Sequence, residues 1–131
     1  MMAPARILVA DDDDAMRTTV AFTLLDDGHV VEEAASGNEV LRLVEAAGSS
    51  VSREQDYDLV VMDIRMPGLS GLETVRRLRA LRSAPPVILM TAFASPAVID
   101  DARALRVPLL SKPFSLGDLR RLAQETLRSP L

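Results

Sequence analysis

The apolar run at residues 59–62, Leu-Val-Val-Met, ends abruptly in the carboxylate of Asp63, and Pro67 and Gly68 follow shortly afterwards. Strands inside a parallel sheet carry such unbroken runs because helices cover both faces of the sheet. The run therefore predicts a buried parallel strand, and the proline and glycine predict a turn after it. Asp63 would then lie at the carboxyl edge of the sheet, where open α/β folds place their sites. A lone Asp before a turn is more often a solvated loop residue. Other segments of the chain are therefore needed to show whether Asp63 belongs to a site.

Four other apolar runs predict further strands. They lie at residues 6–10, 29–32, 87–91 and, with a weaker pattern, 107–110. The last run contains Pro108, which cannot donate a backbone hydrogen bond, so this strand is expected at an edge of the sheet.

The segments between the strands predict helices, because their apolar residues recur every three or four positions. Asp14 is expected to cap the first helix and Gly28 to end it. Ser36 and Glu39 have the spacing of a capping box, and the polar stretch 48–56 is expected to be a loop. One helix after each strand gives (βα)5. Right-handed crossovers make this an α/β protein with a doubly wound, five-stranded parallel sheet.

Composition excludes several classes of protein. A chain of 131 residues suits one domain, and the absence of cysteine excludes a disulfide framework and a thiolate metal site. No apolar run is long enough to span a membrane, and the N-terminal residues lack the apolar core of a signal peptide. The net charge of −4 argues against direct nucleic-acid binding by this domain. We therefore expect a cytoplasmic protein that binds neither membranes nor nucleic acid.

Polar residues follow four of the five predicted strands. Asp11 and Asp12 come after the first, Asp63 ends the third, Thr91 ends the fourth, and Lys112, the only lysine, follows the fifth. Each residue has an ordinary structural explanation when taken singly. The carboxyl ends of parallel strands meet at one edge, however, so these side chains are expected to lie close together. Their combination predicts a reaction centre.

The residue types indicate phosphoryl chemistry on a metal. Neighbouring carboxylates repel one another unless some are protonated or a cation joins them. Oxygen ligands favour Mg²⁺, with Mn²⁺ as an alternative. Asp63 can then attack a phosphoryl group, while Lys112 offsets charge on the transferring oxygens and the Thr91 hydroxyl donates a hydrogen bond. Ala92 is small and leaves space beside the site.

Four segments in order resemble the motifs of response-regulator receiver domains of two-component signalling. They are Ile-Leu-Val-Ala-Asp-Asp-Asp at 7–13, Met-Asp-Ile-Arg-Met-Pro-Gly at 62–68, Met-Thr-Ala at 90–92 and Ser-Lys-Pro-Phe at 111–114. The resemblance implies one receiver domain over 1–131, with a core at about 6–127. It also implies a flavodoxin-like sheet with strand order 2-1-3-4-5 and a cis peptide before Pro113.

The resemblance also implies roles and partners. A sensor histidine kinase or a phosphotransfer protein would donate the phosphoryl group, and the surface of the fourth helix, fifth strand and fifth helix would switch to bind a downstream protein or to form a homodimer. His29 is expected to be a half-exposed strand residue and not the donor. The implied site residues are Asp63 as phosphoacceptor, Asp12 as direct metal ligand, Asp11 as a ligand through water, the carbonyl of Arg65 as a further ligand, Thr91 as switch hydroxyl and Lys112 as phosphate-binding lysine.

Two positions depart from the family pattern. Leu109 stands where receivers usually carry Tyr or Phe, so the aromatic rotamer change that reports activation is missing. The segment 105–108 lacks the Gly-Ala common there, which predicts an atypical end of the fourth helix. In addition, Arg65 and Phe93 flank the expected path of an attacking water, and we hypothesise that the bulk of Phe93 slows hydrolysis.

Two alternatives stay open on the sequence. One is a phosphatase resembling haloacid dehalogenases, in which Asp11 is the nucleophile and Asp13 the acid/base. Such enzymes need a late acidic pair for the metal, and here only Asp118 and Glu125 follow the lysine. The other is a receiver-like binding module that is recognised without phosphorylation, a hypothesis that Leu109 favours weakly and the intact acid set opposes.

Overall fold

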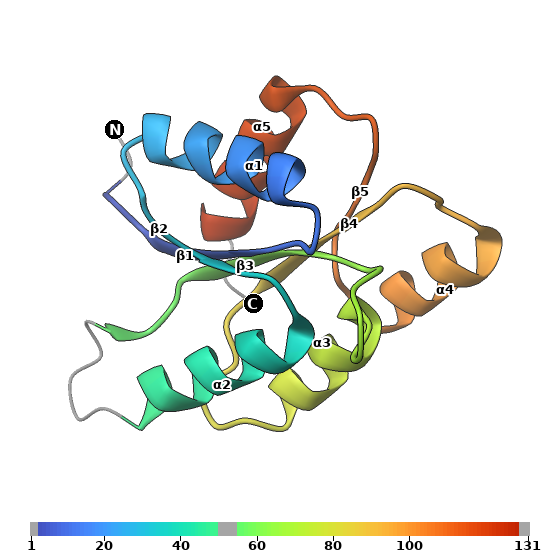
Figure 1. The fold of residues 1–131 in the computed structure, drawn as a ribbon, viewed down its shortest axis with the longest axis horizontal. Coiled ribbons are helices and arrows are strands. Elements are labelled where there is room, and N and C mark those ends of the chain that lie inside the picture. The colour runs from blue at the N-terminus through green and yellow to red at the C-terminus, as the bar shows by residue number, and fades with distance from the viewer. Residues whose placement is uncertain (1–2, 50–54, 129–131) are drawn as a thin grey trace.

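The computed structural model describes residues 3–49 and 55–128, and it contains the predicted alternation of strands and helices (Figure 1). All neighbouring strands pair in parallel, in the order β2-β1-β3-β4-β5. Fold class and strand order are therefore confirmed. The elements are β1 Arg6–Ala10, α1 Asp14–Asp26, β2 Val30–Ala34, α2 Gly37–Gly48, β3 Leu59–Asp63, α3 Gly71–Arg79, β4 Val87–Thr91, α4 Pro96–Ala104, β5 Leu109–Ser111 and α5 Leu116–Arg128.

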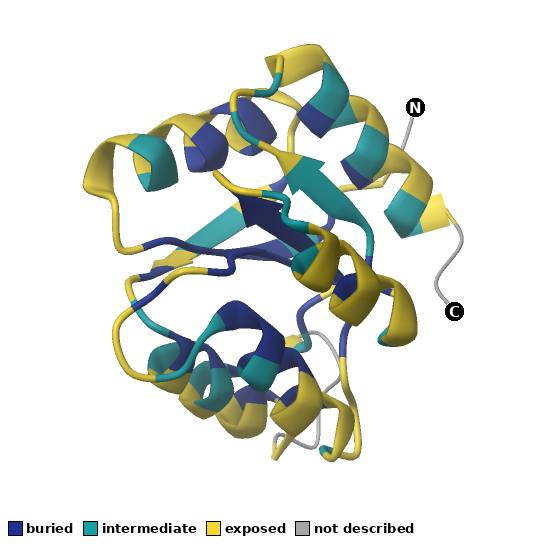
Figure 2. Ribbon diagram, turned by 90° about the vertical axis from the view of Figure 1, so that its right-hand side faces the viewer, coloured by how far each residue is buried: buried dark blue, intermediate teal, exposed yellow. Residues whose placement is uncertain are grey.

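Helices cover both faces of the sheet (Figure 1). α1 and α5 lie on one face, and α2 and α3 lie on the other. Alternate residues of β3 enter the two cores: Val60 and Met62 pack on the side of α2 and α3, while Leu59 and Val61 pack on the side of α1 and α5. All five residues of β3 are buried, whereas the outer helix faces are exposed (Figure 2). Double-sided burial explains why the run at 59–62 is apolar without alternation.

The helix starts agree with the predicted caps except at α1. Asp13, not Asp14, is the N-cap: its carboxylate accepts hydrogen bonds from Ala15 N at 3.0 Å and Met16 N at 3.3 Å. Asp13 has extended backbone angles and Asp14 is the first helical residue, so the prediction was wrong by one position. Ser36 caps α2 as predicted, and its hydroxyl accepts from Glu39 N at 3.2 Å.

The sequence predicted that the fifth strand begins at residue 107, but the strand begins at Leu109, directly after Pro108. Pro108 lacks an N–H, but its carbonyl accepts a hydrogen bond from Leu89 N at 2.9 Å. β5 is a short edge strand of three residues, and its edge position is as predicted. The proline therefore restricts where the strand begins without removing it.

The prediction that His29 is a half-exposed strand residue was wrong. His29 precedes β2 and is 7% exposed. Its Nδ1 accepts a hydrogen bond from Ala5 N at 3.0 Å, which satisfies a polar atom inside the protein. Gly28, with a φ of 91°, ends the α1 segment as predicted and turns the chain into this position.

The stretch 48–56, predicted to be a loop, lies mostly outside the described residues. α2 extends to Gly48, one residue into that stretch, and residues 50–54 are not among those described. Across 3–49 and 55–128, no helix has the length and apolar character that crossing a membrane requires.

Candidate active site at the carboxyl edge of the sheet

Register in the sheet brings three carboxylates together. Ala10 pairs with Met62, so Asp11 follows β1 at the level where Asp63 ends β3. Carboxylate oxygens of Asp11, Asp12 and Asp63 all lie within 4.8 Å of one another. Asp11 is fully buried, Asp63 is 6% exposed and Asp12 is open to solvent. We call these three residues the acid cluster. A set of oxygen donors with one exposed member suits a hard divalent cation such as Mg²⁺.

Lys112 reaches the acid cluster from the far edge strand. Its Nζ lies 3.1 Å from Asp11 Oδ2 and 3.4 Å from Asp63 Oδ1. The backbone helps to place it, because Lys112 N donates to Thr91 O at 2.7 Å. The peptide bond from Lys112 to Pro113 is cis, as the resemblance implied. One ammonium therefore faces two of the three carboxylates in a largely buried setting.

Electrostatics favour an additional positive charge at this place. Burial raises the pKa of Asp63, the charge of Asp11 raises that pKa further, and Lys112 offsets part of the effect. Burial alone would lower the pKa of Lys112, but its hydrogen bond to Asp11 and the charge of Asp63 raise that pKa above its usual value. Three acids with one ammonium leave negative charge that a divalent cation would offset.

The Thr91 hydroxyl is engaged inside the β4–α4 loop. It donates to Phe93 O at 3.1 Å and accepts from Phe93 N at 3.1 Å. Thr91 is buried, while Ala92 is exposed and the Phe93 side chain is 67% exposed. The sheet thus brings Thr91 to the same edge as Asp63, with its hydroxyl held by the neighbouring loop.

The turn after β3 lies close to Asp63. Gly71 N donates to Ile64 O at 2.7 Å, and a Cβ on Gly71 would lie only 2.5 Å from Asp63 O. Any larger residue would therefore displace the backbone that carries Asp63. The exposed Arg65 lies on this turn and lines, with Asp12, a hollow of about 370 Å³ beside the acid cluster.

Arg17 is a residue of the site that the sequence analysis missed. Its Nη1 donates to Asp11 O at 2.8 Å, its Nη2 to Asp14 Oδ1 at 2.7 Å and its Nε to Glu33 Oε1 at 3.1 Å. It thereby ties the loop carrying Asp11 to α1 and β2. The spacing of three between Asp14 and Arg17 indicated a pair on the helix surface, but nothing in the sequence indicated that the guanidinium reaches back to the Asp11 carbonyl.

The other predicted positions lie nearby. Leu109 is half-buried and packs against the core on the side of α2 and α3. It follows Pro108 at the start of β5, and the register pairs it with Leu89, two residues before Thr91. The late acids of the phosphatase alternative, Asp118 and Glu125, both lie on α5.

The comparison with protein families decides between a receiver domain and a phosphatase. The model of the response regulator receiver domain matches residues 7–124. This chain belongs to the response regulator receiver domain family. The haloacid-dehalogenase alternative is therefore set aside, and the domain is the receiver of a two-component response regulator.

Several relatives agree with this assignment. The transcriptional regulatory proteins TcrA and PdtaR of Mycobacterium tuberculosis are 35% identical over 130 residues and 34% identical over 118 residues. These matches cover 96% and 88% of the chain but only 47% and 53% of the relatives, so the receiver spans about half of their length. A CheY-like receiver domain protein from Methanospirillum hungatei superimposes with a TM-score of 0.83 at 27% identity, covering 96% of this chain and 95% of that one.

Proposed function

We propose that Asp63 is the phosphoacceptor of this receiver and that a sensor histidine kinase or a phosphotransfer protein is its donor. The observation that carries the proposal is the placement of Lys112 Nζ 3.1 Å from Asp11 and 3.4 Å from Asp63 within one acid cluster. Lys112 and Asp63 follow or end different strands, and both face the same small region. Such an arrangement can offset the negative charge of an incoming phosphoryl group.

In the proposed reaction an oxygen of Asp63 attacks the phosphorus of a phosphohistidine. The P–O bond to Asp63 forms, the P–N bond breaks, and its electron pair returns to the imidazole nitrogen. Lys112 offsets charge on the phosphoryl oxygens throughout. In the later hydrolysis a water attacks the phosphorus, releasing phosphate and restoring the Asp63 carboxylate.

We further propose that Asp11, Asp12, Asp63 and the carbonyl of Arg65 hold the Mg²⁺, or Mn²⁺, that receivers typically use. The oxygen-only donor set and the excess of negative charge around Asp63 support this. A divalent cation there supplies positive charge next to the transferring oxygens. Arg17 keeps the Asp11 loop in place through the Asp11 carbonyl.

The proposed switch begins at Thr91. Its hydroxyl gives up its two hydrogen bonds with the Phe93 backbone and donates one to the phosphoryl group on Asp63. The β4–α4 loop then moves with Thr91. The surface formed by α4, β5 and α5 then changes and binds a downstream protein or a second copy of the domain. Leu109 lies on β5 in that surface, so the change is transmitted by packing and not by an aromatic rotamer.

Intact-mass spectrometry after incubation with acetyl phosphate and Mg²⁺ tests the proposal. We expect one phosphoryl adduct that requires Mg²⁺, disappears in Asp63→Asn and persists in Asp100→Asn, a control that changes an exposed acid on α4. An adduct that survives Asp63→Asn but not Asp11→Asn would make Asp11 the nucleophile. No adduct in a folded protein, with either acetyl phosphate or a phosphorylated histidine kinase, would favour the phosphorylation-independent module.

A further inference from the structure

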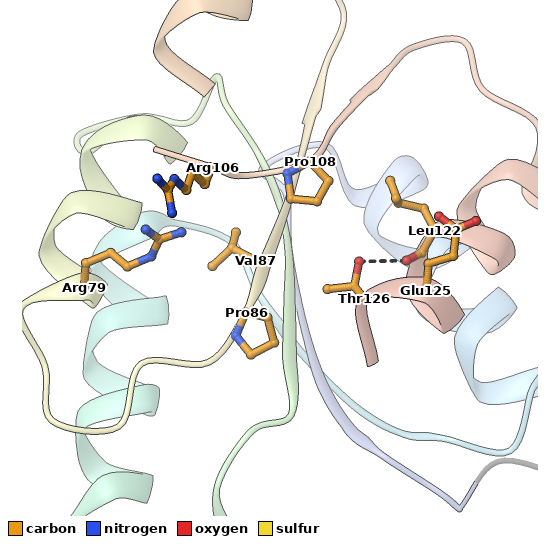
Figure 3. A pocket seen from close by; sticks show the side chains of 8 residues that line it. All are labelled: Arg79, Pro86, Val87, Arg106, Pro108, Leu122, Glu125 and Thr126. Atoms are coloured by element: carbon orange, nitrogen blue, oxygen red, sulfur yellow. Dashed lines mark hydrogen bonds between the residues drawn. The ribbon is translucent and has the colours of Figure 1, made fainter. Parts of the chain in front are cut away.

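A cavity of about 360 Å³ opens at the amino edge of the sheet, away from the acid cluster (Figure 3). Val87 begins β4 and Pro108 precedes β5, whereas Thr91 and Lys112 lie at or beyond the other ends of the same strands. Pro86, Val87 and Pro108 form an apolar floor. The volume lies within the range of small-molecule sites, and no step of the proposed phosphoryl transfer uses this cavity.

Two arginines from different elements meet at one side of the cavity. Arg79 ends α3 and Arg106 lies in the turn between α4 and β5, and their guanidinium groups point toward each other (Figure 3). Neither makes a side-chain hydrogen bond or salt bridge with any residue in the described parts of the chain. Arg76 and Arg77 on the same helix, in contrast, both pair with Glu73. Two facing cations that pair with no described carboxylate favour an oxyanion between them, which guanidinium groups can bind through paired hydrogen bonds.

Arg106 occupies a backbone position that normally favours glycine. Its φ is 55°, and the bonds from Arg106 N to Arg103 O and from Val107 N to Ala102 O, both 3.0 Å, close the end of α4. Residues other than glycine are disfavoured at such a helix end. The backbone therefore gives no reason for an arginine here, while the cavity gives its side chain a place. The two hydrogen bonds close the turn although it lacks the Gly-Ala common in receivers.

The wall formed by α5 carries hydrogen-bond acceptors where the opposite side carries cations. The Thr126 hydroxyl donates to Leu122 O at 2.8 Å, so its oxygen remains available as an acceptor on that side. Glu125 adds a carboxylate across the cavity from the arginines (Figure 3). The cavity thus has cations at one side, an apolar floor and acceptors at the other side. It suits a ligand with a single anionic group and repels one with an anion at both ends.

We propose that this cavity binds a small organic anion. The carboxylate or phosphate group of this ligand lies between Arg79 and Arg106. The apolar body of the ligand covers Pro86, Val87 and Pro108. The end nearest α5 is neutral or donates a hydrogen bond to Glu125 or Thr126.

An amide NMR titration of the full chain with benzoate, phenyl phosphate and benzyl alcohol tests the proposal. It is made without divalent cations, so that the acid cluster does not attract anions. We expect saturable shifts at Val87, Val107 and Thr126 with benzoate or phenyl phosphate, and none with benzyl alcohol, which has the ring without the charge. The tighter of the two anions identifies the preferred oxyanion.

Variants distinguish the effect of the guanidinium charges from the effect of the backbone conformation at residue 106. Arg79→Gln and Arg106→Gly should each weaken binding roughly fivefold or more. Arg106→Gly supplies the residue that the helix end favours, so it removes the guanidinium without unfolding the turn. The control Arg76→Gln should bind like the wild type, and Glu125→Gln should bind the anion more tightly. Absence of saturable shifts, equal binding of benzyl alcohol, or unchanged affinity in both Arg79→Gln and Arg106→Gly would overturn the proposal.

Discussion

Lys112 Nζ lies 3.1 Å from the fully buried Asp11 Oδ2, although 101 residues separate the two in the chain. The same ammonium is the only described cation within salt-bridge distance of Asp63. One side chain therefore balances the inner part of the acid cluster, and we expect both the stability of the domain and its proposed chemistry to depend on it.

Replacing Lys112 by Met should lower the free energy of unfolding by about 3 kcal/mol without divalent cations, because Asp11 and Asp63 lose their counter-charge inside the protein. Added Mg²⁺ should restore part of this loss by binding the folded acid cluster. Urea denaturation with and without Mg²⁺ measures both effects. Arg121→Met, which removes an exposed ion pair on α5, is the control and should change stability by less than about 1 kcal/mol. Equal stability of Lys112→Met and wild type would contradict the structure.

Arg17→Met should weaken Mg²⁺ binding by about tenfold, because the guanidinium positions the Asp11 loop through the Asp11 carbonyl without touching the ion itself. Isothermal titration calorimetry with Mg²⁺ or Mn²⁺ gives the affinity directly. Arg17→Lys should recover part of it, and Arg76→Met should leave it unchanged. If Arg17→Met lowered the stability of the fold but bound Mg²⁺ as tightly as wild type, Arg17 would be a structural residue only.

We hypothesise that the Phe93 ring, which is 67% exposed, slows hydrolysis. Phe93→Ala should therefore shorten the lifetime of the phosphoryl group on Asp63 by a few-fold. The Thr91 hydroxyl bonds to the backbone of Phe93 and not to its ring, so the variant keeps those bonds and its stability should change by less than about 0.5 kcal/mol. Loss of the adduct with time, followed by intact mass, gives the rate. An unchanged lifetime would mean that Phe93 does not limit the approach of water.

Tyr57 should titrate about two pH units above a free tyrosine. Burial and the hydrogen bond from its hydroxyl to Glu32 Oε2, at 2.6 Å, raise the pKa of Tyr57 to about 12. The raised pKa means that the folded state holds this proton more tightly. Tyr57 therefore stabilises the fold below about pH 10, and this contribution is lost as the pH rises toward 12.

The titration can be followed without interference, because Tyr57 is the only tyrosine and there is no tryptophan. Phenolate absorbance against pH should have its midpoint near 12 in the folded protein, and Tyr57→Phe should abolish the signal. A midpoint near 10 while the protein is still folded would mean that in solution Tyr57 is neither buried nor bonded to Glu32 as the structure has it.

The difference between predicted and observed boundaries has local causes. Asp13 and Asp14 are both good capping residues, and only the backbone angles decided that Asp13 is the cap. The apolar character of residues 107–110 indicated a strand, but the edge strand pairs only from Leu109 onward. His29 was misjudged because its partner, the N–H of Ala5, lies 24 residues earlier in the chain.

The sequence by itself determined the layered sheet and the residues at its carboxyl edge, because hydrophobic periodicity and strand-end positions are local properties. Only the tertiary structure decided what each side chain bonds to. It placed Lys112 between Asp11 and Asp63, engaged Thr91 with Phe93 and brought Arg79 to face Arg106. Such contacts depend on how separate strands and helices pack against one another, and no local pattern in the chain encodes the distances between them.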